Sequence, residues 1–168
     1  IQINEPDETA VILFTSGSEA LPKAVPLSHK NIVSDLAGAF DMIDINNNEV
    51  FLSFLPPFHS FGFTVLSILP LISGIKIAYT PNPTDAREVL RVLKHVQANI
   101  LIGTPGFLKL LLSQGTPYFF KSIKYAISGA EAMPLELKEK FESMTQNALI
   151  LEGYGITECS PVISLNPF

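Results

Sequence analysis

The sequence is poor in the residues that several classes of protein need. Cys159 is the only cysteine among 168 residues, so the chain can build neither a disulfide framework nor a cysteine-rich metal site. Only 16% of the residues are charged, below the typical quarter, and no run of lysine or arginine is present to neutralise a phosphate backbone. The net charge is −5, so we expect no nucleic-acid partner, and the single cysteine fits a cytoplasmic protein.

No hydrophobic run is long enough to span a membrane. The most apolar stretch covers residues 61–77, and Pro70 and Gly74 interrupt it before the roughly 20 residues that a spanning helix needs. Hydrophobic residues make up 47% of the chain and the mean hydropathy is +0.33, which favours a core-rich piece of a larger protein over a lipid-contacting one. Another apolar run, at residues 161–165, reads as a strand close to the last residue. We therefore expect residues 1–168 to form a single, partial domain.

Apolar strands and amphipathic helices alternate along the chain. Strands are expected at residues 10–14, 50–54, 75–79, 99–102, 124–128, 148–151 and 161–165. The helices between them are expected to begin near Ser28, Ser60, Thr84 or Asp85, Thr104 and Pro134. This order predicts an α/β fold, with a mostly parallel sheet and helices on both faces. Ligands of such sheets bind beyond the carboxyl ends of the strands, which directs attention to residues 15–23, 56–62, 103–106, 129–133 and 152–160.

The loop after the first strand has the groups that bind polyphosphate. It contains three hydroxyls, a glycine and Lys23 within nine residues, and phosphate oxygens accept from backbone N–H groups, hydroxyls and ammonium groups. It is not a Walker P-loop, because the second glycine and the hydroxyl after the lysine are absent, so an ordinary P-loop NTPase is disfavoured. On composition alone, an ordinary polar turn remains open.

Four segments in order resemble the signature elements of the adenylate-forming superfamily, which comprises acyl-CoA synthetases, luciferases and nonribosomal adenylation domains. They are LFTSGSEALPKAV at 13–25, PPFHSFG at 56–62, SGAEAM at 128–133 and EGYGITECSP at 152–161. The last, with its Tyr-Gly-x-Thr-Glu pattern, is the most specific. Glu19 replaces the usual threonine, which is similar to the branch of acyl–acyl carrier protein synthetases and 2-acylglycerophosphoethanolamine acyltransferases.

The resemblance implies a fold and a set of site residues. The fold is part of the N-terminal domain of an adenylate-forming enzyme, and the cofactors are ATP and Mg²⁺. The implied phosphate contacts are Thr15, Ser16, Gly17, Ser18 and Lys23. Nucleotide contacts extend to Gly129, Ala130, Glu131, Tyr154, Gly155 and Thr157. Glu158 is the implied metal ligand, and the implied catalytic residues are Thr157, Glu158 and His59, with His59 beside the substrate carboxylate.

The resemblance also implies a reaction and its partners. A fatty carboxylate attacks the α-phosphate of ATP, and a phosphopantetheine thiol then takes the acyl group. Acyl carrier protein is the favoured acceptor and CoA the alternative, as in a long-chain acyl-CoA synthetase. Phe61 and Phe63 lie where an amino-acid activator usually has an aspartate, which favours an apolar substrate. The longer protein is compatible with peripheral association at the inner face of a membrane.

Several expectations limit this interpretation. The family's ribose-binding aspartate and the lysine of its C-terminal domain lie downstream of the last motif, so we expect these 168 residues alone to be inactive. Ala20 and Ala24 replace glycines of the family, and only glycine takes positive φ freely, which leaves a degenerate, non-catalytic nucleotide- or lipid-binding module as an alternative. A dinucleotide fingerprint fails because Glu158 occupies the third glycine position, and Cys159 is interpreted as a small packing residue.

Overall fold

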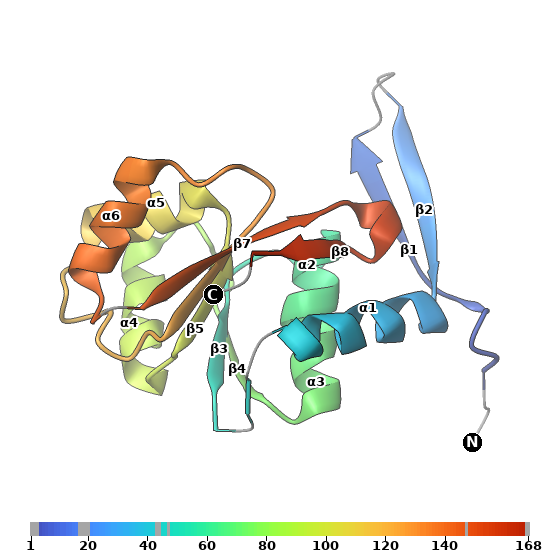
Figure 1. Ribbon diagram of the computed structural model, residues 1–168, viewed down its shortest axis with the longest axis horizontal. Coiled ribbons are helices and arrows are strands. Elements are labelled where there is room, and N and C mark those ends of the chain that lie inside the picture. The colour runs from blue at the N-terminus through green and yellow to red at the C-terminus, as the bar shows by residue number, and fades with distance from the viewer. Residues whose placement is uncertain (1–3, 17–20, 43–44, 47, 147, 167–168) are drawn as a thin grey trace.

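A six-stranded sheet with helices on both faces forms the body of the protein (Figure 1). The computed structural model describes residues 4–16, 21–42, 45–46, 48–146 and 148–166. Within them the strand order is β4-β3-β5-β6-β7-β8. Their bounds are β3 (Val50–Ser53), β4 (Lys76–Tyr79), β5 (Ile100–Gly103), β6 (Tyr125–Ser128), β7 (Leu149–Gly155) and β8 (Val162–Leu165). The first five strands in this order pair in parallel and β8 is antiparallel to β7, which confirms the predicted fold class.

The helices begin where the sequence predicted. The Asp85 carboxylate accepts from the N–H of Glu88 at 3.1 Å, which selects Asp85 over Thr84 as the N-cap of α4. Thr104 and Pro105 are the N-cap and first residue of α5. The helices are α1 (His29–Met42), α2 (Ser60–Phe63), the π-helical segment η1 (Thr64–Ile68), α3 (Leu69–Ser73), α4 (Ala86–Val96), α5 (Pro105–Gln114) and α6 (Leu135–Met144).

Two hydrophobic cores lie on opposite faces of the sheet. Successive residues of a strand point to opposite faces, so Leu101 packs into one core while its neighbours Ile100 and Ile102 pack into the other. In Figure 1, α4, α5 and α6 cover one face, and α1, α2 and α3 cover the other. Leu101, Ile100 and Ile102 are completely buried. The sheet therefore separates two packed layers, and the functional residues described below belong to the layer of α1.

The first strand differs from the prediction. Residues 9–16 form β1 (Thr9–Ser16), which pairs antiparallel with β2 (Pro22–Ser28) in a separate hairpin that projects from the sheet (Figure 1). The strand predicted at residues 10–14 is therefore confirmed, but the prediction that it is buried is wrong, because Ile12 and Phe14 are 54% and 66% exposed. β2 was not predicted, and it contains Pro22 and Pro26, which are unfavourable inside a sheet. A two-stranded ribbon tolerates both prolines, because each strand is an edge.

The glycine-rich end of β7 also differs from the prediction. Residues 152–155 were expected to form a loop, but they continue the strand to Gly155. The reason is β8, which pairs Gly153 with Leu165 and Tyr154 with Ser164 and so gives the extended backbone its hydrogen-bond partners. Among the helices of the described residues, none is long and apolar enough to cross a membrane.

Candidate active site

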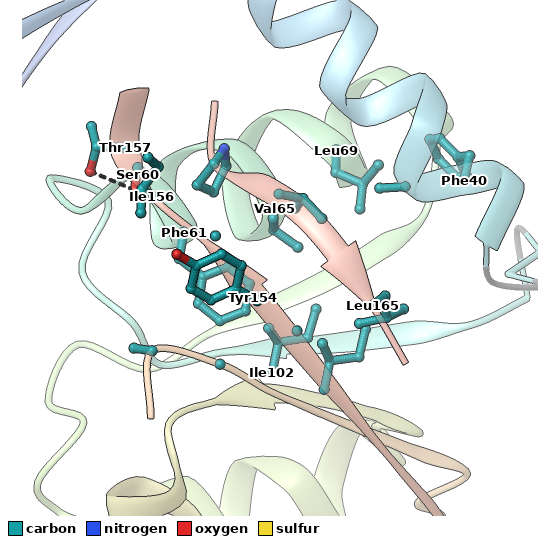
Figure 2. A pocket seen from close by; sticks show the side chains of 18 of the residues that line it. Phe40, Ser60, Phe61, Val65, Leu69, Ile102, Tyr154, Ile156, Thr157 and Leu165 are labelled. Carbon is teal, nitrogen blue, oxygen red and sulfur yellow. Dashed lines mark hydrogen bonds between the residues drawn. The ribbon is translucent and has the colours of Figure 1, made fainter. Parts of the chain in front are cut away.

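One cavity brings together three of the four motif segments. It has a volume of about 190 Å³ and lies on the α1 face, where residues of β3, β5, β6, β7 and β8 line it (Figure 2). The residues that line it are Ala39, Phe40, Ile45, Phe51, Ser60, Phe61, Val65, Leu69, Ile102, Ile127, Gly129, Ala130, Gly153, Tyr154, Gly155, Ile156, Thr157, Pro161, Val162 and Leu165.

One wall of the cavity is backbone with little side chain. A Cβ atom on Gly129 would lie 3.3 Å from the carbonyl oxygen of Gly153, so the two segments approach closely. Ala130 follows with a backbone φ of 71°, a conformation that residues other than glycine rarely adopt. Tyr154 lies beside this wall and is 63% exposed. An aromatic ring next to open backbone is an arrangement that can receive a planar base.

Gly155 is required by packing of the chain on itself. A Cβ atom there would lie 2.0 Å from the carbonyl oxygen of Pro161. The same carbonyl accepts from the N–H of Ile156 at 3.0 Å, and the register of β7 and β8 shifts between Tyr154 and Gly155. This irregularity ends the strand and leads into the 3-10 helix η2 (Thr157–Cys159).

A hydroxyl pair joins two of the motifs. The Oγ of Ser60 and the Oγ1 of Thr157 lie 3.1 Å apart, as the dashed line in Figure 2 marks. Thr157 was predicted as a site residue, whereas Ser60 was predicted only as the start of a helix. His59 itself is exposed at the N-cap of α2, its ring 4.7 Å from that of Phe58, and it is not part of the described lining.

The phosphate-loop lysine reaches the predicted metal ligand. Lys23 Nζ donates to Glu158 Oε1 at 2.7 Å, which links the β1–β2 hairpin to η2. The hydrogen bond from Lys23 is the main cause that lowers the pKa of Glu158 below its usual value, and a backbone N–H adds to it. Thr15 lies opposite Lys23 in the hairpin register. This pairing places a cation and a carboxylate where both are accessible to a ligand.

Some predicted residues lie elsewhere or outside the described structure. Glu131 is exposed and is not part of the described lining, whereas Glu152, which sequence analysis did not single out, accepts from the N–H of Met133 at 3.3 Å. Cys159 is exposed, so its interpretation as a packing residue is wrong. Predicted phosphate contacts Gly17 and Ser18, with Glu19 and Ala20, lie outside the described residues, as does the side chain of Ser16.

The backbone at position 24 does not require the glycine that the family usually has there. It lies in β2 opposite Phe14, and the described non-glycine residues with positive φ are Gln97, Ala130 and Ser160. An alanine in an extended strand carries no backbone strain, so Ala24 by itself does not favour the degenerate-module alternative.

Asp35 is a half-buried carboxylate that none of the sequence motifs includes. It lies on α1, and its Oδ1 accepts from the N–H of Val162 at 3.1 Å. Burial raises the pKa of Asp35 to about 6, although the hydrogen bond from Val162 acts in the opposite direction. Its second oxygen, Oδ2, is buried and has no hydrogen-bond partner.

The donor set decides how a divalent cation could be held. The described residues contain no group of three or more His, Cys, Asp or Glu side chains that could form a metal site. Glu158 offers one accessible carboxylate beside the hydroxyl-bearing Thr157. Mg²⁺ typically takes one or two carboxylates and completes its shell with water and phosphate oxygens, so this arrangement fits an ion that arrives with a polyphosphate.

Comparison with known proteins gives one family over the whole chain. Residues 1–168 match the AMP-binding enzyme family. The long-chain-fatty-acid–CoA ligase of Bacillus subtilis is 32% identical over 170 residues, which cover 98% of this chain and 30% of that protein. The 4-coumarate–CoA ligase 3 of Arabidopsis thaliana is 27% identical, over 95% of this chain and 29% of its own length. This chain therefore spans about 30% of the length of these curated relatives.

Solved structures agree on the fold. The ATP-bound MatB of Rhodopseudomonas palustris superimposes with a TM-score of 0.85 and 28% identity, covering 98% of this chain and 32% of that protein. Its ligand-free form gives the same TM-score at 26% identity.

Proposed function

Since the chain belongs to the AMP-binding enzyme family, we propose that it supplies the ATP- and carboxylate-binding part of an acid–thiol ligase that activates a fatty carboxylate. One observation carries this proposal. Segments separated by up to 97 residues in sequence, Ser60 in one motif and Thr157 in another, meet at a single cavity beside the Lys23–Glu158 pair. Enzymes of this family use ATP, and an ATP-bound relative shares the fold.

The nucleotide would occupy the backbone wall. Tyr154, which lines the cavity and is 63% exposed, offers a ring face to adenine. Thr157 has a hydroxyl to donate to the α-phosphate. Lys23 would leave Glu158 to neutralise phosphate oxygens, so that the Glu158 carboxylate becomes free to hold Mg²⁺. A bound Mg²⁺ would supply charge neutralisation of the phosphates.

The carboxylate substrate would occupy the apolar part of the cavity. Phe40 of α1, Val65 of η1 and Leu69 of α3 line it together with Ile102 and Leu165 (Figure 2). In the proposed first step, a carboxylate oxygen attacks the α-phosphorus, and the bond to pyrophosphate breaks. Positioning and electrostatic stabilisation by these side chains are what the protein contributes. An aliphatic chain suits this lining better than a charged substrate does, because the lining side chains offer no counter-charge.

The proposed second step transfers the acyl group to a phosphopantetheine thiol, which displaces AMP. Acyl carrier protein and CoA both carry this thiol. Glu19, the residue that favoured acyl carrier protein, lies outside the described residues, and the relatives named above are CoA ligases. An assay in which holo-acyl carrier protein and CoA compete for the acyl group decides which of the two is the acceptor. A phospholipid-linked acyltransferase is a further proposal for the longer protein.

ATP–pyrophosphate exchange on the full-length protein tests the proposal. A panel of carboxylates from C2 to C18 is compared, with the 168-residue chain as control. We expect exchange with medium or long fatty acids and none from the 168 residues alone. Exchange by none of the carboxylates would leave a non-catalytic nucleotide-binding module as the better description.

A matched pair of variants tests the metal assignment. Glu158→Gln removes the accessible carboxylate, so we expect Mg²⁺ to lose its effect on ATP affinity, read by calorimetric titration with and without the ion. Glu139→Gln changes an exposed carboxylate on α6, away from the cavity, and is expected to retain the Mg²⁺ effect. Equal Mg²⁺ dependence in wild type and Glu158→Gln would contradict the assignment.

A further inference from the structure

A single hydrogen bond fastens strand β8 to helix α1. Asp35 Oδ1 accepts from the backbone N–H of Val162 at 3.1 Å, across 127 residues of sequence. Val162 pairs with Gly155 at the irregular end of the β7–β8 ladder, and the register there shifts by one residue. β8 has only four residues and pairs with β7, so this side-chain bond is a large part of what fixes its first residue.

The two elements that this bond joins form one wall of the cavity. Ala39 lies one helical turn after Asp35, on the same side of α1, and lines the cavity with Phe40. From the opposite element, Val162 and Leu165 line it as well. Figure 2 shows Phe40 and Leu165 at the same end of the cavity, away from Ser60 and Thr157. Asp35 itself is not part of the described lining.

The Asp35 side chain is half-buried, with Oδ1 bonded to Val162 and Oδ2 out of reach of solvent. Burial of a carboxylate is unfavourable unless its oxygens are paired, yet Oδ2 has no partner. The elements packed against α1 supply no cation that would compensate the charge of the Asp35 carboxylate. Neither β8 nor η1 contains a titratable residue, and the one in β2, Lys23, is bonded to Glu158. The carboxyl group is therefore held as a hydrogen-bond acceptor at a position where a leucine would fill the space without that penalty.

We propose that Asp35 is a positioning residue that fixes the spacing of α1 and β8, and thereby determines which acyl chains the apolar end of the cavity accepts. This inference rests on the proposed function, because it requires a carboxylate substrate in that cavity. Loss of the acceptor lets β8 move away from α1, which widens the end lined by Phe40 and Leu165. The nucleotide wall at Gly129 and Tyr154 lies on β6, β7 and their loops. Tyr154 also pairs with Ser164 of β8, but the parallel ladder between β6 and β7 holds this wall when β8 moves.

Four variants of the full-length protein test this. Asp35→Ala removes the acceptor, Asp35→Asn keeps it without the charge, and Asp35→Glu keeps it on a longer side chain. Asn99→Ala is the matched control, because Asn99 Oδ1 also accepts from a strand N–H, that of Val50 at 2.7 Å. Asn99 and Val50 are not part of the described cavity lining. The readout is kcat/KM for a straight-chain acid relative to a branched acid with the same number of carbons, together with KM for ATP.

One methylene in a hydrophobic pocket changes discrimination by about 10- to 200-fold, so we expect Asp35→Ala to lower the straight-to-branched ratio by roughly tenfold. We expect KM for ATP to stay within about twofold, since the ladder between β6 and β7 keeps the nucleotide wall in place. Asp35→Asn should restore the wild-type ratio and Asn99→Ala should leave it unchanged. Amide hydrogen exchange at Val162 should be faster in Asp35→Ala and unchanged in Asp35→Asn, independent of activity.

The outcomes separate this inference from the proposed function. If wild type exchanges pyrophosphate with none of the carboxylates, the proposed function fails. If wild type is active and Asp35→Ala lowers both acids equally, Asp35 only stabilises the fold and the inference is overturned. Should Asp35→Ala not fold, Asp35→Glu decides, because a folded Asp35→Glu with the wild-type ratio also overturns the inference.

Discussion

At Gly155 the backbone of β7 meets the backbone of Pro161, and neither can give way as a flexible side chain would. We predict that Gly155→Ala destabilises the protein by about 3 kcal/mol, because the added methyl group forces the chain apart where β7 leads into η2. Urea denaturation measures the loss. Gly38→Ala is the matched control, since a Cβ atom at Gly38 of α1 meets nothing within 4 Å.

The control has an expected sign of its own. Alanine is favoured over glycine inside a helix, so Gly38→Ala should stabilise the protein by about 0.5–1 kcal/mol. If the two alanine variants lose equal stability, the close approach of Gly155 and Pro161 is not what makes a glycine necessary there.

Asp35 gives a pH dependence of stability. Its pKa is raised from 3.8 to about 6 in the folded protein, so the folded state binds a proton more readily than the unfolded chain. The stability that protonation adds is complete below pH 3.8 and is lost as the pH rises through 6. Asp35→Asn keeps a neutral acceptor at every pH. We therefore predict that Asp35→Asn is more stable than wild type at pH 8, by on the order of 1 kcal/mol.

Urea denaturation from pH 4 to pH 8 measures this prediction. The advantage of Asp35→Asn should shrink as the pH falls from about 6 toward 4, because the wild-type carboxyl group then becomes neutral as well. An advantage that stays constant over the whole range would show that the buried charge is not its cause.

Residue types indicated which segments meet, but not the contacts that they make. Tyr154, Thr157, Glu158 and Lys23 were selected because a base, phosphates and Mg²⁺ need those groups. Tyr154 and Thr157 line the cavity, and Lys23 bonds to Glu158, the neighbour of Thr157; their roles stay predictions. Ser60 and Asp35 were missed, because each has its partner about a hundred residues away in sequence. No local pattern can reveal such a contact before the sheet is assembled.

At the scale of elements, helices were predicted more accurately than the ends of strands. Asp85 and Thr104 are caps whose side chains bond within their own helix, so the local sequence determines them. The end of β7 and the pairing of β1 with β2 depend on partners elsewhere in the chain, which the local sequence does not identify. The helix expected from Ser60 to Ser73 is present, with a π-helical segment in its middle that no composition signal marked.

The hairpin supplies a prediction about motion on binding. In the ligand-free state Lys23 bonds to Glu158, an exposed pair of the kind that contributes little by itself. Mg·ATP would replace this single contact with several charge-assisted bonds to phosphate. We predict that Mg·ATP slows amide hydrogen exchange in β1 and β2 by at least about tenfold, while β4 at the opposite edge of the sheet is unaffected. Equal protection of the hairpin and β4 would contradict this role.

On the scale of the whole molecule, the two faces of the sheet have different tasks. Leu93 of α4 and Leu69 of α3 are both buried, but only Leu69 lines the cavity. We predict that Leu93→Ala and Leu69→Ala each destabilise the protein by about 2–5 kcal/mol. Leu93→Ala should leave KM for ATP and for the carboxylate unchanged at a temperature where it is folded, whereas Leu69→Ala should alter carboxylate selectivity.

Denaturation and steady-state kinetics on the same preparations measure both effects. A change of carboxylate selectivity in Leu93→Ala would show that the α4 face communicates with the cavity through the sheet, against the separation of the two cores.

The separation of the cores has a consequence for how such a protein can be altered. A sequence can adapt to a warmer environment by improving the layer under α4, α5 and α6, where substitutions meet the sheet from the side opposite the cavity. A new specificity must instead arise in the layer under α1, where Phe51, Val65 and Leu69 belong to the core and line the cavity at once. A designer would therefore randomise the two layers in separate libraries, screening the first by heat and the second by substrate.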